Sequence, residues 1–240
     1  MNDLCYLCGK SDPNIDEHVV ADCLLPKPAT GNINPIILRA HKACSDAYSM
    51  DEEYLRGLVE GAAGDFDGGH VLHEKHVRSM FRPASQAYRD SLFRHARIVN
   101  LETHGGIFLG PGLALRSDNR RLRRIGRKIG RGILFRDQGV YAPDESVDCA
   151  YLPPQDIEPA YERNMTAKKP LWTMVFSENA SLCVLGPGVG VRRIYFRQRM
   201  DSHPGWKKAW CAMVVQVYAI WFLIKIPIPS LDQPIEKAAS

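Results

Sequence analysis

The spacing of apolar and polar positions separates an N-terminal stretch of mixed structure from the longer remainder of the chain. Two short apolar stretches, 15–21 and 33–38, predict strands. From 45 to 62, apolar residues recur at helical spacing with acidic residues between them, which predicts an amphipathic helix. A glycine- and aspartate-rich stretch follows at 61–69, and we expect a domain boundary there.

After this boundary the pattern changes from helices to strands. Helical spacing is visible at 71–81, at 84–97 and, in a strongly basic segment, at 116–132. Short runs rich in β-forming residues follow, and the candidate strands are 134–135, 172–176, 182–185, 194–197 and 210–226. We therefore predict an α+β protein of two domains: a ββα module over 1–60, and a helical, then antiparallel β-rich domain over 61–240.

The longest apolar run extends from 210 to 224 and is interrupted by Gln216. It is shorter than the ~20 residues that a membrane-spanning helix requires, and its composition favours a core strand over a buried helix or membrane contact. The N-terminus lacks the basic and apolar segments of a secretory signal. Four cysteines are scattered without paired spacing, which is typical of reduced thiols: Cys23, Cys149, Cys183 and Cys211. We expect a soluble, cytoplasmic protein without a membrane partner.

Composition adds one constraint. The 240 residues are 45 % hydrophobic and 24 % charged, which is typical of a globular chain and excludes a disordered or fibrous one. Lysine and arginine number 31 against 27 acidic residues, for a net charge of +4. This excess is too small to indicate nucleic-acid binding by itself, so the distribution of the charges has to decide.

Four cysteine and histidine residues in the N-terminal part have the spacing of a zinc site. Cys5 and Cys8 are separated by two residues, and so are His41 and Cys44. Two such pairs with a compact segment between them are typical of tetrahedral Zn²⁺ coordination. Because protein ligands fill all four positions, we predict a structural zinc ion.

The segment between the two pairs contains Glu17-His18, an acidic residue beside a histidine, which a purely structural zinc site does not need. Together with Cys5-Tyr6-Leu7-Cys8-Gly9, Asn34 and the second pair, it resembles the zinc-framed HNH endonuclease family over residues 3–56. In this family His41 would stand where a third cysteine is usual, and imidazole is an ordinary zinc ligand. The resemblance implies a ββα-metal fold.

The resemblance also implies roles for individual residues. His18 would be the general base that deprotonates water, and Glu17 would hold Mg²⁺ or another divalent ion at the phosphodiester. Asn34, with Asn32 as its competitor, would hold the imidazole in position. The alternative is that His18 only satisfies a backbone group or substitutes as a zinc ligand.

One position departs from the family. The residue after the last cysteine is usually Asn or His and completes the catalytic metal site, but here Ser45 and then Asp46 follow Cys44. A serine hydroxyl is a weak ligand for a hard cation, whereas a carboxylate is a good one. Asp46 facing Glu17 and His18 would favour an enzyme, and Ser45 alone facing them would favour a binding module.

Within the basic segment 116–132, the stretch 120–131 is rich in cationic residues and contains no acid. We expect its side chains to contact phosphate groups, because neutralising phosphates releases condensed counterions. The alternatives are a structural face balanced by nearby acids, and an anionic membrane surface. The expected partner is nucleic acid, in the form of DNA. The candidate contact residues are Arg120, Arg121, Arg123, Arg124, Arg127, Lys128 and Arg131.

The sequence therefore predicts a metal-dependent, HNH-type endonuclease that hydrolyses nucleic-acid phosphodiester bonds. The alternative is a non-catalytic, zinc-stabilised module with a degenerate HNH site that binds nucleic acid or a protein.

Overall fold

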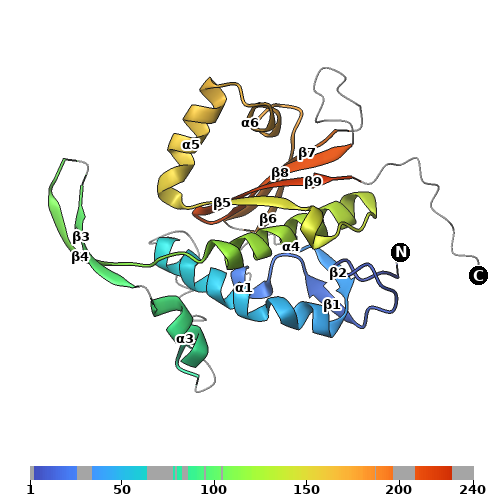
Figure 1. The fold of residues 1–240 in the computed structure, drawn as a ribbon, viewed down its shortest axis with the longest axis horizontal. Helices are drawn as coiled ribbons and strands as arrows, with labels where there is room; N and C mark the ends of the chain where they lie inside the picture. The colour runs from blue at the N-terminus through green and yellow to red at the C-terminus, as the bar shows by residue number, and fades with distance from the viewer. Residues whose placement is uncertain are drawn as a thin grey trace, which may run out of the picture.

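The computed structural model describes residues 3–25, 34–63, 78, 80–82, 86–94, 96–103, 105–186, 188–196 and 209–228. Helices and strands are mixed, and every strand pairing is antiparallel, so the predicted α+β class is confirmed. Figure 1 shows helix α4 (Asn119–Gln138) in the middle, with the N-terminal elements on one side and a large sheet on the other.

The N-terminal elements are two short strands and a long helix. Strands β1 (Ile15–His18) and β2 (Ile37–Ala40) pair in a register that sets His18 opposite Ile37. Helix α1 (Lys42–Ala63) begins two residues after β2, and the 3₁₀ turn η1 (Asp22–Leu24) packs against it. The order strand, strand, helix agrees with the sequence pattern. Helix α1 continues to Ala63 and so includes the first residues of the stretch 61–69 in which the domain boundary is expected.

The large sheet has the strand order β5-β9-β8-β7-β6 within the described ranges. Its strands are β5 (Asp148–Leu152), β6 (Ser181–Gly186), β7 (Val189–Phe196), β8 (Trp210–Val217) and β9 (Ile220–Pro227). The single strand predicted over 210–226 was wrong, because this run is a hairpin. Tyr218 makes the turn with a φ of 53°, and Val217 pairs with Ile220.

One face of this sheet is covered by α4. The helix begins after Asp118, whose carboxylate accepts hydrogen bonds from two backbone amides of the first turn, and it ends at Gly139 with a φ of 67°. Ile125 and Ile129 are buried along it. The strand predicted at 134–135 was wrong, because these residues continue the apolar stripe of α4. The 3₁₀ turn η3 (Asp144–Ser146) then leads into β5.

Two helices cover the opposite face of the sheet (Figure 1). They are α5 (Pro154–Thr166) and α6 (Pro170–Val175). Val175 joins Trp210, Ala212 and Val214 in a separate apolar cluster on this face. The strand predicted at 172–176 was wrong, because its apolar residues lie in α6 and at its end, where they pack on the sheet.

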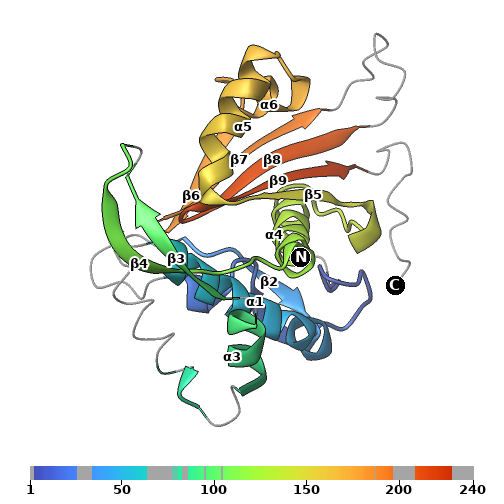
Figure 2. The ribbon, with the colours of Figure 1, turned by 60° about the vertical axis from the view of Figure 1, so that its left-hand side comes forward.

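A hairpin projects from the body of the molecule beside α3 (Gln86–Phe93), as Figure 2 also shows. It consists of β3 (Arg97–Glu102) and β4 (Phe108–Ala114). The helix predicted over 84–97 is therefore shorter than expected, because α3 ends at Phe93 and Arg97 already belongs to β3. The helix predicted at 71–81 and the boundary stretch at 61–69 lie mostly outside the described residues.

One apolar cluster extends from the N-terminal elements through α1 and α4 to the sheet. It includes Cys5, Leu55, Ile129 and Phe222, which come from all of these parts. The division into 1–60 and 61–240 remains a prediction. None of the described helices is long and apolar enough to cross a membrane.

Candidate metal centre and Glu17 cluster

The four predicted zinc ligands lie together. Cys5 and Cys8 come from the turn before β1, His41 directly precedes α1, and Cys44 lies in the first turn of α1. One ligand atom from each side chain falls within 4.8 Å of all the others. Three sulfur atoms and one imidazole at this separation can hold a metal ion, and the donor set fits structural Zn²⁺. These four residues are therefore confirmed as a possible metal centre.

Hydrogen bonds at His41 direct one ring nitrogen to this centre. Nδ1 lies 3.3 Å from the Cys8 sulfur and 4.0 Å from the Cys44 sulfur. Nε2 lies 2.8 Å from the carbonyl oxygen of Ser11. A proton on Nε2 satisfies that carbonyl and leaves Nδ1 free to bind a metal, which is the usual arrangement of a ligating histidine.

The crowding of the thiols also favours a cation. Burial, followed by the hydrogen bond from Cys8 and the proximity of Cys5, raises the pKa of the Cys44 thiol to about 12. Without a cation among the sulfur atoms, Cys44 would keep its proton at neutral pH. A bound metal ion removes this penalty, because it stabilises the thiolates that repel one another.

Close to the metal centre, Glu17 is held by two other parts of the chain. Its Oε2 accepts a hydrogen bond of 2.7 Å from the Ser45 hydroxyl, and its Oε1 lies 2.5 Å from the ammonium nitrogen of Lys128. The same ammonium group contacts Glu52 of α1. The Lys128 side chain is 0 % exposed. We call Glu17, Ser45, Glu52 and Lys128 the Glu17 cluster.

The Glu17 cluster is a buried ammonium between two carboxylates. Burial raises the pKa of Glu52, and the positive charge of Lys128 opposes that rise. Lys128 also lies 5.7 Å from the centre of the Tyr48 ring, which adds a cation–π contact. The ammonium therefore lies beside the carboxylate that the HNH resemblance assigns to a divalent ion.

The other residues assigned to catalysis are not gathered around Glu17. Asp46 forms an exposed ion pair with Lys42, at 2.9 Å and 3.0 Å, on the first turns of α1. Asn34 is exposed, and its backbone amide donates to the carbonyl of Leu185 on β6. His18 is half-buried at the end of β1. Among the described residues no hydrogen bond joins the His18 imidazole to Asn34, and Asn32 lies outside them.

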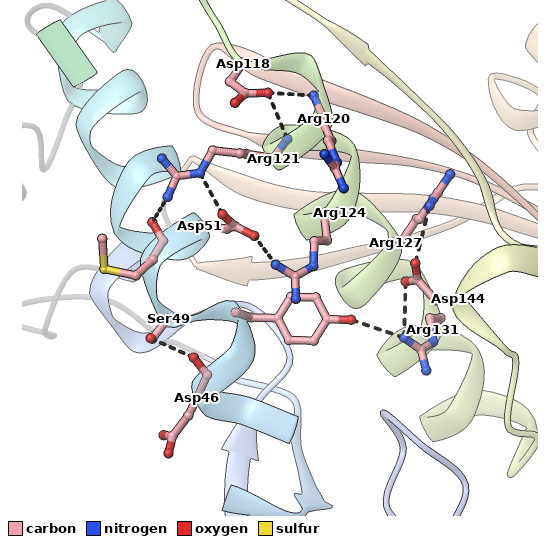
Figure 3. A network of polar contacts seen from close by, with 12 residues as sticks. Asp46, Ser49, Asp51, Asp118, Arg120, Arg121, Arg124, Arg127, Arg131 and Asp144 are labelled. Carbon is pink, nitrogen blue, oxygen red and sulfur yellow. Dashed lines mark hydrogen bonds and ion pairs between the residues drawn. The ribbon is translucent and has the colours of Figure 1, made fainter. Parts of the chain in front are cut away.

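Arginine side chains in the first two turns of the basic helix α4 form ion pairs with α1. Asp51 accepts from Arg121 at 2.7 Å and from Arg124 at 2.8 Å, and its side chain is 8 % exposed (Figure 3). The guanidinium groups also stack on aromatic rings, Arg121 over Tyr54 and Arg124 over Tyr48. These two arginines hold α4 against α1.

Farther along α4, arginines pair with the segment that precedes β5. Asp144 accepts from Arg127 and from Arg131, each at 3.3 Å (Figure 3). Arg131 is buried, and it also donates to the carbonyls of Ala142 and Leu7. Because Leu7 lies between Cys5 and Cys8, two of the predicted zinc ligands, Arg131 joins this turn to α4.

Five of the seven candidate nucleic-acid contacts on α4 thus have acidic partners within the protein. They are Arg121, Arg124, Arg127, Lys128 and Arg131. Arg120 and Arg123 are exposed, and among the described residues no hydrogen bond or ion pair of their guanidinium groups is seen. Sequence reasoning missed Asp51 and Glu52 as partners because they lie far from α4 along the chain. It missed Asp144 because no pattern indicates that the segment after α4 folds back onto the helix.

Comparison with protein-family models, with curated proteins and with solved structures found no match. The resemblance to HNH endonucleases therefore rests on the motif residues of 3–56 alone.

Proposed function

We propose that this chain is a zinc-stabilised, nucleic-acid-binding protein in which Lys128, rather than a divalent ion, neutralises the HNH-like carboxylate of Glu17. The observation that carries the proposal is the Glu17 cluster. Both carboxylate oxygens of Glu17 are engaged, one by Ser45 and one by the fully buried ammonium of Lys128.

A divalent ion at Glu17 would have to compete with this ammonium. The two cations would repel each other strongly in a buried site, where charges are poorly screened. Lys128 cannot withdraw to solvent without leaving the partly buried carboxylates of Glu17 and Glu52 without a counter-charge, which is costly. The geometry therefore favours a site that is already neutralised.

The residues after Cys44 support the same conclusion. Ser45 contacts Glu17, whereas Asp46 pairs with Lys42 on the exposed side of α1. A serine hydroxyl adds no charge to attract Mg²⁺, so the stronger of the two candidate ligands is directed elsewhere.

Nucleic acid is the proposed partner because positive charge is left over after the internal pairs are counted. The chain carries a net charge of +4, and Arg120 and Arg123 are exposed on α4. Exposed arginines bind phosphate groups through paired N–H donors, and such contacts give affinity without sequence preference.

A metal-dependent endonuclease of the HNH type is the second candidate. One observation favours it: Glu17 and His18, to which the resemblance assigns the ion and the general base, are both half-buried at the end of β1. In that case Mg²⁺ at Glu17 would polarise the phosphate, and His18 would deprotonate the attacking water.

Nicking of supercoiled plasmid in Mg²⁺ or Mn²⁺ tests the two candidates. The purified protein is compared with His18→Ala, after equal zinc content has been verified, and binding to the same DNA is measured at several salt concentrations. We expect salt-dependent binding without cleavage by either protein. Ion-dependent cleavage that disappears in His18→Ala would establish the endonuclease instead. If the protein neither cleaves nor binds the DNA, the proposal is overturned in favour of a protein-binding role.

A further inference from the structure

Two adjoining hollows lie where the base of the β3–β4 hairpin meets the start of α4. The larger, of about 610 Å³, is lined by Arg94, Arg97 and Arg116 with Ala96, Ala114 and Leu115. The smaller, of about 440 Å³, again includes Arg94 and Arg116, and adds Arg120. In Figure 1 the segment after β4 runs from the hairpin to α4, so both hollows lie on the hairpin side of the molecule.

We propose that these hollows, which we call the arginine hollow, bind successive phosphate groups of a nucleic-acid strand through Arg94, Arg97, Arg116 and Arg120. The inference rests on the proposed function and assigns it a surface. This surface overlaps the predicted basic face of α4 only at Arg120.

The arginines of the arginine hollow differ from most of the basic residues of α4 in their surroundings. All four arginines are exposed, and their guanidinium groups form no hydrogen bond or ion pair within the part of the chain that the structure describes. Of the described residues that line the larger hollow, none is acidic. Asp118 lines the smaller one, but one of its carboxylate oxygens already accepts from the backbone amides of Arg120 and Arg121.

The floor of the hollow is held in place by α1. The hydroxyl of Tyr54 accepts a hydrogen bond of 2.8 Å from the amide of Asp118 and donates one of 3.3 Å to the carbonyl of Arg116. Tyr54 is itself buried, and Arg121 stacks on its ring at 4.6 Å. The segment that presents Arg116 and Arg120 is therefore fixed before any ligand binds, which lowers the entropy cost of binding.

The shape favours a strand over a small anion. The arginines come from three different segments: Arg94 follows α3, Arg97 begins β3, and Arg116 and Arg120 lie on either side of the α4 N-cap. Because Arg94 and Arg116 line both hollows, the positive charge forms one continuous track. A planar guanidinium that offers paired donors suits each phosphate along such a track.

Fluorescence anisotropy of a short labelled DNA duplex tests the proposal on the full chain. The variant Arg94→Gln/Arg116→Gln removes the two arginines common to both hollows. Its control is Lys168→Gln/Lys169→Gln, which removes the same charge from two exposed lysines between α5 and α6, on the opposite side of the sheet from α4. Zinc content and circular dichroism verify that each variant is folded.

We expect the arginine variant to raise Kd about tenfold and to reduce the slope of log Kd against log salt by about 2, since each phosphate contact contributes about 0.9. The lysine control should change Kd less than about twofold. Equal weakening by the two variants, or wild-type affinity in the arginine variant, would overturn the arginine hollow while leaving DNA binding intact. If the wild-type protein does not bind the duplex at all, the proposed function has failed as well.

Discussion

Lys128 is the residue whose environment most constrains the chemistry of the site. Its ammonium has no exposed surface and contacts Glu17 and Glu52, which come from β1 and α1. A buried ion pair is weak evidence for stability, because desolvation offsets much of the attraction between the charges. Removing one member is different, because it leaves the others buried without a counter-charge. The Glu17 cluster therefore requires a cation, and the chain supplies one.

Replacing Lys128 by methionine should convert the Glu17 cluster into a divalent-ion site. Without added metal, we expect the free energy of unfolding to fall by about 3–5 kcal/mol, because two carboxylates remain unpaired. Millimolar Mg²⁺ or Mn²⁺ should then raise the Tm of Lys128→Met, since carboxylate oxygens are good ligands for these ions. Differential scanning fluorimetry with and without the ions measures both effects.

Lys42→Met is the matched control, because it removes an ammonium from an exposed pair with Asp46. It should change Tm little, with or without divalent ions. If Mg²⁺ stabilises the wild-type protein as much as Lys128→Met, then Lys128 does not occupy the place of a metal ion.

The metal centre makes a second prediction at the scale of single residues. Cys8→Ser should lose bound zinc and lower Tm, because it removes one of the four ligands and metal-binding energy contributes to folding. Inductively coupled plasma mass spectrometry should find one zinc ion per wild-type chain. Cys183→Ser, at a half-buried cysteine of β6, should keep its zinc. Zinc retained by Cys8→Ser at the wild-type ratio would contradict the assignment.

At the scale of elements, Asp137 joins the end of α4 to β7. It accepts hydrogen bonds from Arg136 at 2.7 Å and from Tyr195 at 2.6 Å, and it pairs with Arg193. Burial alone would raise the pKa of Asp137, but these hydrogen bonds and the charges of both arginines outweigh burial and lower it below the ordinary value near 3.8. The carboxylate form therefore stabilises the fold.

Asp137→Asn should cost about 2 kcal/mol at neutral pH, the size of a charged hydrogen bond. Since the pKa is lower in the folded state, this contribution is present above about pH 4 and is lost as the pH falls through the folded pKa. The Tm difference between wild type and variant should thus shrink below pH 4. Release of zinc in acid affects both proteins and cancels in the difference. A Tm difference that is constant from pH 7 to pH 3 would contradict the ionic role.

The sequence predicts best those features whose signal is local. The spacing of Cys5, Cys8, His41 and Cys44 identified the metal centre, because each ligand pair lies within one turn. A basic helix was expected over 116–132 and is present over 119–138. Its extension was missed because the short apolar run after residue 132 fits a strand as well as a buried helix turn.

Features that depend on distant partners could not be predicted in the same way. The cationic run of α4 contains no acid, so its pattern alone fits both a phosphate-binding surface and an internal ion-pair network. Asp51 and Glu52 decide between these for Arg121, Arg124 and Lys128, and they lie on α1, some 70 residues away in the chain. Only the packing of α4 against α1 brings them together.

For the whole molecule, α4 is the element that joins the metal-binding part to the sheet. Glycines let it approach both layers closely. A Cβ atom at Gly130 would lie 2.8 Å from the Ile224 side chain of β9, and one at Gly132 would lie 2.6 Å from Val19, just after β1. Gly132 therefore sets the distance between α4 and the strand that carries Glu17 and His18.

Gly132→Ala tests this close approach. Alanine is the better helix former by about 1 kcal/mol, so without a clash the substitution should stabilise the protein. Overpacking against buried Val19 should outweigh that gain and lower the free energy of unfolding by about 1–3 kcal/mol, as measured by urea denaturation. Arg123→Ala, at an exposed position of the same helix, should stay within about 0.5 kcal/mol of wild type.

A double-mutant cycle with Val19→Ala separates the clash from other causes. Val19→Ala alone should destabilise the protein because it leaves a cavity, but in the double variant the methyl group added by Gly132→Ala occupies part of that space. The double variant should then lose less free energy of unfolding than the two single variants lose together. We expect a difference of about 1 kcal/mol or more, the coupling typical of residues in contact. Strict additivity would mean that α4 and the chain that carries Glu17 are not in contact at this point. The packing of Gly132 on Val19 would then not be what holds Lys128 between the two carboxylates of the Glu17 cluster.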